Sequence, residues 1–322
     1  MLLDEFSIIE TFFQNQQQQR DDVVLNSGDD CALLKVPNNK LLAVSTDTLV
    51  AGVHFFEDMP PEALGYKSLA VNLSDLAAMG AEPAWVTMNL TLPSVNEKWL
   101  TEFATGFYQL ANRYQVNLVG GDLTKGPLSI TLTVHGFVDD KNVLRRDAAR
   151  PGDFIYVSGM LGDAGAALKI LQSEIQTDEK IKNYLIHKLY YPKPRIELGK
   201  KLNSFANAAI DISDGLVGDL SHILKMSEVG AILFVDQLPL SKELKSLSEK
   251  TDIIKLALTA GDDYELCFTI SEKNRDQTIQ LLNDFDCTCI GKIDDSKKLK
   301  LINTDGSVYK LSGHSYLHFS NV

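Results

Sequence analysis

Aspartate recurs in five short motifs of this chain, each time beside glycine or a small hydroxyl residue. The motifs are Gly28-Asp29-Asp30, Ser45-Thr46-Asp47, Asn72-Leu73-Ser74-Asp75, Gly120-Gly121-Asp122 and Asp211-Ile212-Ser213-Asp214-Gly215. Carboxylates brought within about 5 Å of one another would repel by about 3 kcal/mol per pair at an effective dielectric constant near 20. Such a site needs cations, and several oxygen ligands without a histidine or cysteine cluster suit magnesium. Because protein-bound magnesium usually carries a polyphosphate, the motifs predict nucleotide chemistry.

Each motif also has an ordinary structural interpretation. Gly28–Asp30 and Ser45–Asp47 stand at the ends of short apolar segments, where aspartate often bonds turn amides. Asp75 lies on an apolar helix and could cap a neighbouring loop, and Asp214 could cap the helix that follows it. Asp122 follows two glycines that could let the backbone approach a phosphate. Taken singly, the motifs leave both interpretations open.

Three further segments carry residues that could bind a substrate. Gly261-Asp262-Asp263-Tyr264-Glu265 could contact a cationic substrate or form a turn, and His54 could contact a substrate or pack beside Phe55 and Phe56. The pair Arg145-Arg146 could clamp a phosphate or lie on the surface. The chain lacks a Walker-type GxxxxGK[ST] motif, a strand-linked GxGxxG and the catalytic-loop motifs of protein kinases. A nucleotide site would therefore depend on the acidic motifs.

Composition narrows the class of protein. The chain has 322 residues, a net charge of −12 and 44% hydrophobic residues, which suits two domains with apolar cores. The negative charge, without a basic tract, argues against binding to nucleic acid or to an anionic membrane. We find no signal-peptide pattern and no run of 18 apolar residues, so we expect a cytoplasmic protein. The four cysteines are too few and too dispersed for a disulfide framework or a zinc site.

The elements that must position the motifs alternate between strand and helix. We expect a helix over 4–20, strands over 33–36 and 41–45 and an apolar helix over 62–79. The segment Ser94-Val95-Asn96-Glu97 forms a capping box that should open a further helix, ending at about Tyr114. On the helix over 62–79, Asn72 and Asp75 share one face because they are three residues apart. A strand over 129–138 follows. The turn at 150–153 predicts a boundary between domains 1–149 and 150–322.

The second half continues the alternation. Strands are expected over 154–158, 208–212, 232–235 and 264–270, and helices over 163–171, after Pro194, over 214–226 and over 272–284. Both halves are therefore of mixed α and β character.

The combination and order of the motifs are specific. The segments GDDCALL, STDTLVAGVHF, YKSLAVNLSDLAAMGAEPAW, LVGGDLTKGPLSITLTVHGFV, DISDGL and GDDYELCF resemble the thiamine-monophosphate kinase family, within the aminoimidazole-ribonucleotide-synthetase-like ATP-binding superfamily. The resemblance covers essentially the whole chain. It implies an N-terminal α+β domain whose sheet forms a homodimer, a C-terminal α/β domain, and ATP-dependent phosphorylation of thiamine monophosphate to thiamine diphosphate.

The resemblance also implies roles for individual residues. Several Mg²⁺ ions would be bound by Asp30, Ser45, Thr46, Asp47, Asp75, Asp122, Asp211 and Asp214. ATP would contact Gly121, Asp122, Arg146 and Ser213, while thiamine monophosphate would contact His54, Asp262 and Tyr316. Asp262 stands where the family often has glutamate. The aspartate side chain keeps the charge but is one methylene shorter.

The acceptor of this reaction is a phosphate monoester that is largely dianionic at neutral pH. We therefore expect direct in-line transfer with neither a general base nor a covalent nucleophile in the protein. The alternatives are another ATP-using enzyme of the superfamily and a non-catalytic nucleotide- or metal-binding module. A selenophosphate synthetase would need a reactive residue at the glycine loop, but Cys31 lies in an apolar run. A hydrogenase maturation protein would need a C-terminal cysteine, but the chain ends Phe-Ser-Asn-Val.

Overall fold

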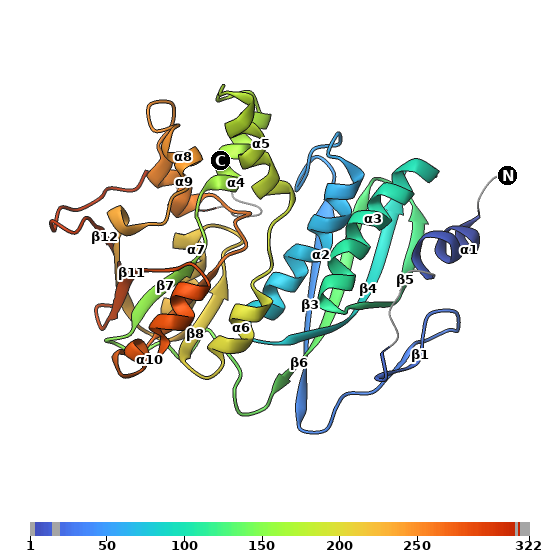
Figure 1. Ribbon diagram of the computed structural model, residues 1–322, viewed down its shortest axis with the longest axis horizontal. Helices are drawn as coiled ribbons and strands as arrows, with labels where there is room; N and C mark the ends of the chain where they lie inside the picture. Colours follow the sequence, from blue (N-terminus) through green and yellow to red (C-terminus); the bar gives the residue numbers. More distant parts are fainter. Residues whose placement is uncertain (1–3, 15–19, 313–314, 316–322) are drawn as a thin grey trace. The chain divides into compact units, whose positions relative to one another are not determined.

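The computed structural model describes residues 4–14, 20–312 and 315, which form two compact units (Figure 1). Unit 1 comprises Met1–Leu76 and Ala81–Asn142, and unit 2 comprises Ala77–Gly80 and Val143–Val322. The boundary expected at 149/150 thus lies shortly after the point where the chain leaves unit 1.

Unit 1 is built on a four-stranded sheet with helices packed against it. The sheet has the order β3-β6-β4-β5, with β4 and β5 parallel and the other pairs antiparallel, in the part of the chain that the structure describes. Its strands are β3 (Lys40–Val50), β4 (Glu82–Leu92), β5 (Asn117–Lys125) and β6 (Ser129–Asp139), and its long helices are α2 (Pro61–Ala78) and α3 (Glu97–Tyr114).

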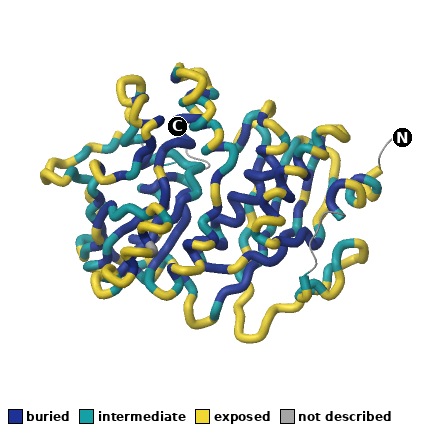
Figure 2. Tube along the Cα trace, viewed as in Figure 1, coloured by how far each residue is buried: buried dark blue, intermediate teal, exposed yellow. Residues whose placement is uncertain are grey.

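The two long helices of unit 1 lie side by side (Figure 1) and approach closely at two glycines. A Cβ atom on Gly65 would lie 2.0 Å from the carbonyl oxygen of Phe103, and one on Gly106 would lie 1.8 Å from that of Glu62. Only glycine permits this spacing. Helix α2 is buried around most of its circumference (Figure 2), so a polar group on it must face a polar partner.

A short hairpin carries the first aspartate motif of unit 1. Strands β1 (Val23–Leu25) and β2 (Leu33–Leu34) pair antiparallel, and Val23, Ala32 and Leu34 pack against a buried cluster of Ala84, Trp85, Val119 and Phe137. The indole Nε1–H of Trp85 donates to Asp22 Oδ1 over 3.0 Å. The chain begins with α1 (Glu5–Ile8) and a π-helical turn (Ile9–Gln14). The far end of the expected helix, at 15–19, lies outside the described residues.

Unit 2 contains a six-stranded mixed sheet of order β12-β9-β11-β7-β10-β8 among its described residues. Only β12 and β9 are parallel there. The strands are β7 (Phe154–Ser158), β8 (Ala206–Asp211), β9 (Gly230–Phe234), β10 (Leu266–Ile270), β11 (Cys287–Asp294) and β12 (Leu299–Ile302). The helices are α4 (Asp163–Leu171), α5 (Glu179–Tyr190), α6 (Ile196–Leu202), α7 (Leu216–Met226), a 3₁₀ turn (Val235–Gln237), α8 (Lys242–Lys245), α9 (Ile253–Thr259) and α10 (Glu272–Asp284).

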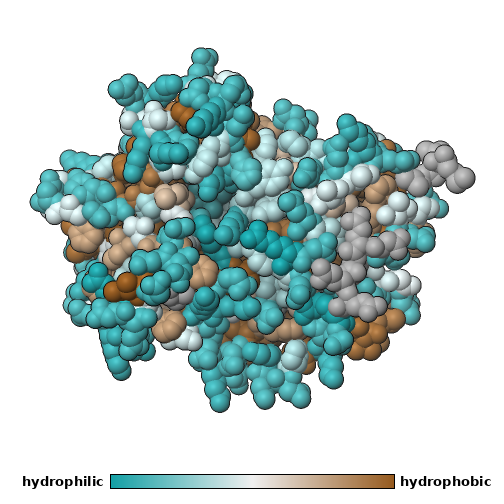
Figure 3. Space-filling model, viewed as in Figure 1, coloured by the Kyte–Doolittle hydropathy of each residue, from teal (hydrophilic) through white to brown (hydrophobic). Residues whose placement is uncertain are grey.

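The sequence expectations were correct for most of the long elements, and the structure corrects several others. Strands β1, β4 and β12 and helices α5, α8 and α9 were not expected. Helix α3 is capped by Asn96, whose side chain accepts from the Trp99 amide over 3.1 Å, and not by Ser94. No helix among the described residues is long and apolar enough to span a membrane, and hydrophilic side chains predominate on the face drawn in Figure 3.

Candidate active site

Two of the four aspartate motifs of unit 1 meet where α2 packs on β3. Ser45 donates its hydroxyl hydrogen to Asp75 Oδ2 over 2.5 Å, and the Asp47 amide donates to Asn72 Oδ1 over 3.1 Å. The expectation that Asn72 and Asp75 share a face of α2 is therefore confirmed. Ser45 and Asp47 lie inside β3 and not at its end, so strand alternation turns both toward the helix.

Thr46 projects to the opposite face of the same strand. Its hydroxyl lies 2.9 Å from that of Thr133 on β6, and the next such pair, Thr48 and Thr131, lies 2.8 Å apart. The sheet thus separates the side chain of Thr46 from the hydroxyl of Ser45. The two side chains therefore cannot contact one ion from the same side of the sheet.

Asp122 and Gly121 lie on β5, at the edge of the same sheet. The register aligns Asp122 with Asn89, Thr131 and Thr48 in one row across the strands, so Asp122 shares a sheet face with Thr46. Gly121 has a φ of 149°, and a Cβ there would lie 1.8 Å from the Met88 carbonyl oxygen. The position thus requires glycine, and it leaves the exposed backbone beside Asp122 open to a ligand.

Asp30 and His54 lie on loops of unit 1. Asp30 is exposed on the hairpin loop between β1 and β2, and its amide donates to Asp29 Oδ1 over 2.8 Å. His54 follows β3, where its Nδ1 accepts from the Val50 amide over 3.1 Å. This contact fixes the neutral tautomer with its hydrogen on Nε2. It supports the interpretation of His54 as an ordered ring that organises the loop.

In unit 2, two motifs pair along their backbones. The Ile212 amide donates to the Glu265 carbonyl, the Tyr264 amide to the Ile212 carbonyl and the Asp262 amide to the Ser213 carbonyl, over 2.8, 2.8 and 2.9 Å. We call the segments 211–215 and 261–265 the paired loops. They extend the ladder between β8 and β10 beyond Asp211. Asp211, Ser213, Asp214 and Asp262 are thus carried by one structure, although the two motifs lie far apart in the sequence.

The paired loops have unusual backbone conformations. Asp262 and Tyr264 have φ values of 69° and 50°, in the left-handed region that costs non-glycine residues energy. A Cβ on Gly261 would lie 2.3 Å from the Ser213 carbonyl oxygen. Strained residues of this kind persist only where their surroundings hold them, and they concentrate at functional sites.

Asp219 supports the first of the paired loops, and the sequence did not reveal this role. Its Oδ2 accepts from the amides of Asp214 and Gly215, over 3.0 and 3.1 Å. Burial raises the pKa of this carboxyl from 3.8 to about 7, and the charge of Asp214 acts in the same direction. An aspartate within the apolar pattern of Leu216, Leu220 and Ile223 was the signal that could have revealed it.

We predict that Asp219→Asn raises the melting temperature of the magnesium-free protein, and by clearly more at pH 8 than at pH 5. The folded-state pKa is raised, so the stability that this group contributes falls as pH rises from about 4 to about 7. Both amides bond a single oxygen, which asparagine retains. Thermal melts of the variant and the wild type at the two pH values check this. A variant that is less stable at pH 8 would contradict it.

Arg146 lies in the segment that leads into unit 2. Its carbonyl oxygen accepts from the Ser227 hydroxyl over 2.8 Å, which ties this segment to the end of α7. The guanidinium of the neighbouring Arg145 pairs with Asp147 through Nε at 2.8 Å and Nη2 at 2.5 Å. Arg145 is thus engaged within the protein, and Arg146 is the better candidate for a phosphate contact.

The structure groups the predicted residues into two sets. Unit 1 carries Asp30, Ser45, Thr46, Asp47, His54, Asp75, Gly121 and Asp122, and unit 2 carries Arg146, Asp211, Ser213, Asp214 and Asp262. Tyr316 lies outside the described residues. Within the described part of the chain, no three His, Cys, Asp or Glu side chains gather as a metal-binding group.

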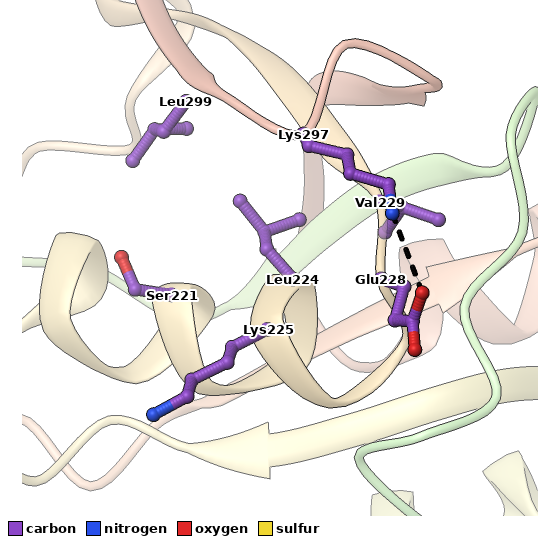
Figure 4. Close-up of a pocket in the computed structure, with 7 residues that line it drawn as sticks. All are labelled: Ser221, Leu224, Lys225, Glu228, Val229, Lys297 and Leu299. Carbon is purple, nitrogen blue, oxygen red and sulfur yellow. Dashed lines mark hydrogen bonds and ion pairs between the residues drawn. The ribbon is translucent and has the colours of Figure 1, made fainter.

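A surface hollow of about 380 Å³ lies elsewhere on unit 2 (Figure 4). It is lined by Ser221, Leu224, Lys225, Glu228, Val229, Lys297 and Leu299, and Lys297 Nζ lies 3.3 Å from Glu228 Oε2. It contains none of the predicted site residues.

Comparison with known proteins identifies the family. The model of the AIR synthase related protein N-terminal domain matches residues 28–138, and that of the C-terminal domain matches residues 150–303. The chain is 48% identical to thiamine-monophosphate kinase of Escherichia coli strain K12, over 99% of each protein.

Two solved structures are similar over most of the chain. Thiamine-monophosphate kinase from Stenotrophomonas maltophilia K279a has a TM-score of 0.87 and 44% identity, covering 96% of this chain and 99% of that one. AaThiL complexed with AMPPCP and TMP has a TM-score of 0.78 and 34% identity, covering 90% and 91%. The two-domain fold expected from the sequence is confirmed. The chain belongs to the thiamine-monophosphate kinase family of AIR synthase related proteins.

Proposed function

We propose that this kinase transfers the γ-phosphoryl group of ATP to the phosphate of thiamine monophosphate, giving thiamine diphosphate and ADP. The observation that carries the proposal is the similarity, over 90% of the chain, to a structure complexed with AMPPCP and TMP. ADP release that depends on thiamine monophosphate, measured at steady state, tests it.

The acceptor chemistry requires little from protein side chains. A phosphate monoester has a second pKa near 6, so it is already a dianionic nucleophile at neutral pH. The obstacle is repulsion between two polyanions, which positioning and electrostatics can overcome in a direct in-line transfer. A transfer of this kind needs groups that bind magnesium and phosphate, and the predicted site consists of carboxylates, glycines and hydroxyl groups. It needs no general base, and we assign none.

We infer that magnesium is bound by Asp30, Ser45, Thr46, Asp47, Asp75, Asp122, Asp211 and Asp214. The donor set is made of oxygen alone, as magnesium prefers, and Ser45 and Asp75 already approach each other across β3 and α2. Thr46, whose side chain faces away from Ser45, would contribute from the face that carries Asp122. When bound, the ions would neutralise the phosphate charges that these carboxylates otherwise repel.

The remaining predicted residues would orient the two substrates. The exposed backbone of Gly121 and Asp122 permits close approach of ATP, with Arg146 and Ser213 as further nucleotide contacts. Asp262 would attract the cationic thiazolium of thiamine monophosphate, together with His54 and Tyr316. The strained conformation of Asp262 supports a functional role for that residue. All four cysteines are free thiols, which agrees with a location in the reducing cytoplasm.

We further propose that the protein is a homodimer formed through unit 1. Strand β3 is a long edge strand whose outer residues Leu42 and Val44 are 42% and 55% exposed. Exposed apolar edges of this kind are normally covered.

Sedimentation velocity at micromolar concentration should therefore give twice the 35.6 kDa mass of the chain. Val44→Lys should shift the protein toward monomer, because it places a charge in the proposed interface. Ile279→Lys, at a similarly exposed position of α10 in unit 2, should not. A monomeric wild type would contradict the proposal.

A further inference from the structure

Asp263 is a carboxylate beside the proposed acceptor contact that the reaction itself does not use. It is adjacent to Asp262 in the paired loops, yet its Oδ2 accepts from the Gly162 amide over 2.8 Å, and the Ala164 amide also bonds this carboxyl. Gly162 and Ala164 belong to the start of α4, far earlier in the chain. The carboxyl of Asp263 thus connects the paired loops to another element of unit 2.

This contact supplies a cap that α4 cannot provide for itself. The N-cap residue of α4 is Gly162, which has no side chain to bond the first amides of the helix. Gly162 has a φ of 84°, and a Cβ there would lie 2.8 Å from the Ala257 backbone nitrogen. No serine or aspartate can therefore replace it. The free amides of this nine-residue helix must be satisfied from elsewhere, and Asp263 does so.

The same contact holds a strained segment. Asp263 lies between Asp262 and Tyr264, whose φ values of 69° and 50° are both in the left-handed region. Their amides bond the Ser213 and Ile212 carbonyls, which fixes the backbone on one side. Asp263 is the residue between them, and the hydrogen bond from the Gly162 amide to its carboxyl holds the segment on the other side. Without its carboxyl, the strained segment would lose its hydrogen bond to the start of α4.

The far end of the segment is fixed independently. Glu265 accepts from the Ser158 hydroxyl and from Arg195, through Nε at 2.5 Å and also through Nη2. Removing the Asp263 carboxyl should therefore loosen residues 261–264 without releasing β10, which begins at Leu266. The effect of a substitution should be local.

We propose that Asp263 is a positioning residue, which caps α4 and thereby holds Asp262 in the conformation that contacts the acceptor. This inference rests on the proposed function for its effect on the acceptor, but the capping itself does not. Burial raises the pKa of Asp263 well above its usual value. The hydrogen bond from the Gly162 amide therefore depends on the carboxyl oxygen as an acceptor more than on a negative charge. An amide oxygen should then substitute for it.

Steady-state kinetics of three variants test the proposal. Asp263→Ala should raise the KM for thiamine monophosphate at least about tenfold and change the KM for ATP less than about twofold. Asp263→Asn, which keeps an oxygen for the Gly162 amide, should stay within about threefold of the wild type in both constants. Asp178→Ala removes the cap of α5, where Asp178 bonds the Lys180 and Ile181 amides, and should change neither constant. If Asp263→Ala does not fold, Asp263→Ser provides the same test.

Hydrogen–deuterium exchange separates this inference from the proposed function. A peptide covering 261–265 should exchange faster in Asp263→Ala than in the wild type or Asp178→Ala, whatever the acceptor is. Unchanged exchange would overturn the capping role. Faster exchange with an unchanged KM for thiamine monophosphate would overturn the positioning role, and absence of wild-type turnover with this acceptor would overturn only the proposed function.

Discussion

Asp122→Asn is expected to lower kcat at least about 100-fold while leaving the melting temperature nearly unchanged. Asp122 is exposed on β5, so its replacement by an isosteric amide removes no core packing. It does remove one charge that would bind magnesium beside the transferred phosphoryl group. Loss of one electrostatic partner of a transition state typically costs about 10²–10³ in rate.

The measurement is kcat at saturating ATP, thiamine monophosphate and magnesium, together with a thermal melt. Asp140→Asn is the matched control, because it makes the same charge change at an exposed position of unit 1 just after β6. Its kcat should equal that of the wild type. If both variants kept wild-type kcat, or if chelation of magnesium left activity undiminished, Asp122 would have no part in the reaction.

Asp75→Asn should likewise abolish most activity, again by at least about 100-fold, without a large loss of stability. The asparagine side chain keeps an oxygen that can accept from the Ser45 hydroxyl, so the contact between α2 and β3 survives. Only the charge is removed. Asp47 lies on the same face of β3 as Ser45, the partner of Asp75, so in the magnesium-free protein the change should reduce charge repulsion on this face. The variant should therefore melt at the wild-type temperature or slightly above it.

Glu62→Gln provides the control for this experiment, since it neutralises an exposed carboxylate in the first turn of the same helix. Melting curves without magnesium and kcat with magnesium should be recorded for both variants. A large fall in the melting temperature of Asp75→Asn, with activity per folded molecule preserved, would instead indicate that Asp75 serves only as an internal cap for a neighbouring loop.

Much of this site could be predicted from short segments of sequence. Asn72 and Asp75 are three residues apart on an apolar helix, and that spacing alone places them on one face of α2. The motifs are local and their order along the chain is distinctive, so the sequence alone was sufficient to indicate the family.

What the sequence could not provide were contacts between distant segments. Strand β4 was missed because Pro83, Thr87 and Asn89 interrupt its apolar pattern, and its place in the sheet depends on β5 and β6. The position of Ser45–Asp47 inside β3 similarly follows from pairing with β6 along the full strand.

The supporting carboxylates were missed for the same reason. The carboxyls of Asp219 and Asp263 hold the paired loops in place, but Asp263 does so through Gly162, far away in sequence. In the sequence, Asp263 is only the second aspartate of a Gly-Asp-Asp turn. The left-handed conformation at Asp262 is likewise a property of the folded loop, because aspartate tolerates this region but adopts it at only a few positions.

The central claim is that the acceptor is the phosphate of thiamine monophosphate. The most direct test is product analysis, by ³¹P NMR, of parallel reactions with thiamine monophosphate and with unphosphorylated thiamine under matched ATP and magnesium. We predict thiamine diphosphate and equimolar ADP from the first, and no phosphorylated product from the second, because the thiamine hydroxyl is a poor nucleophile without a base. Comparable turnover of thiamine, or turnover only with a ribonucleotide acceptor, would contradict the account.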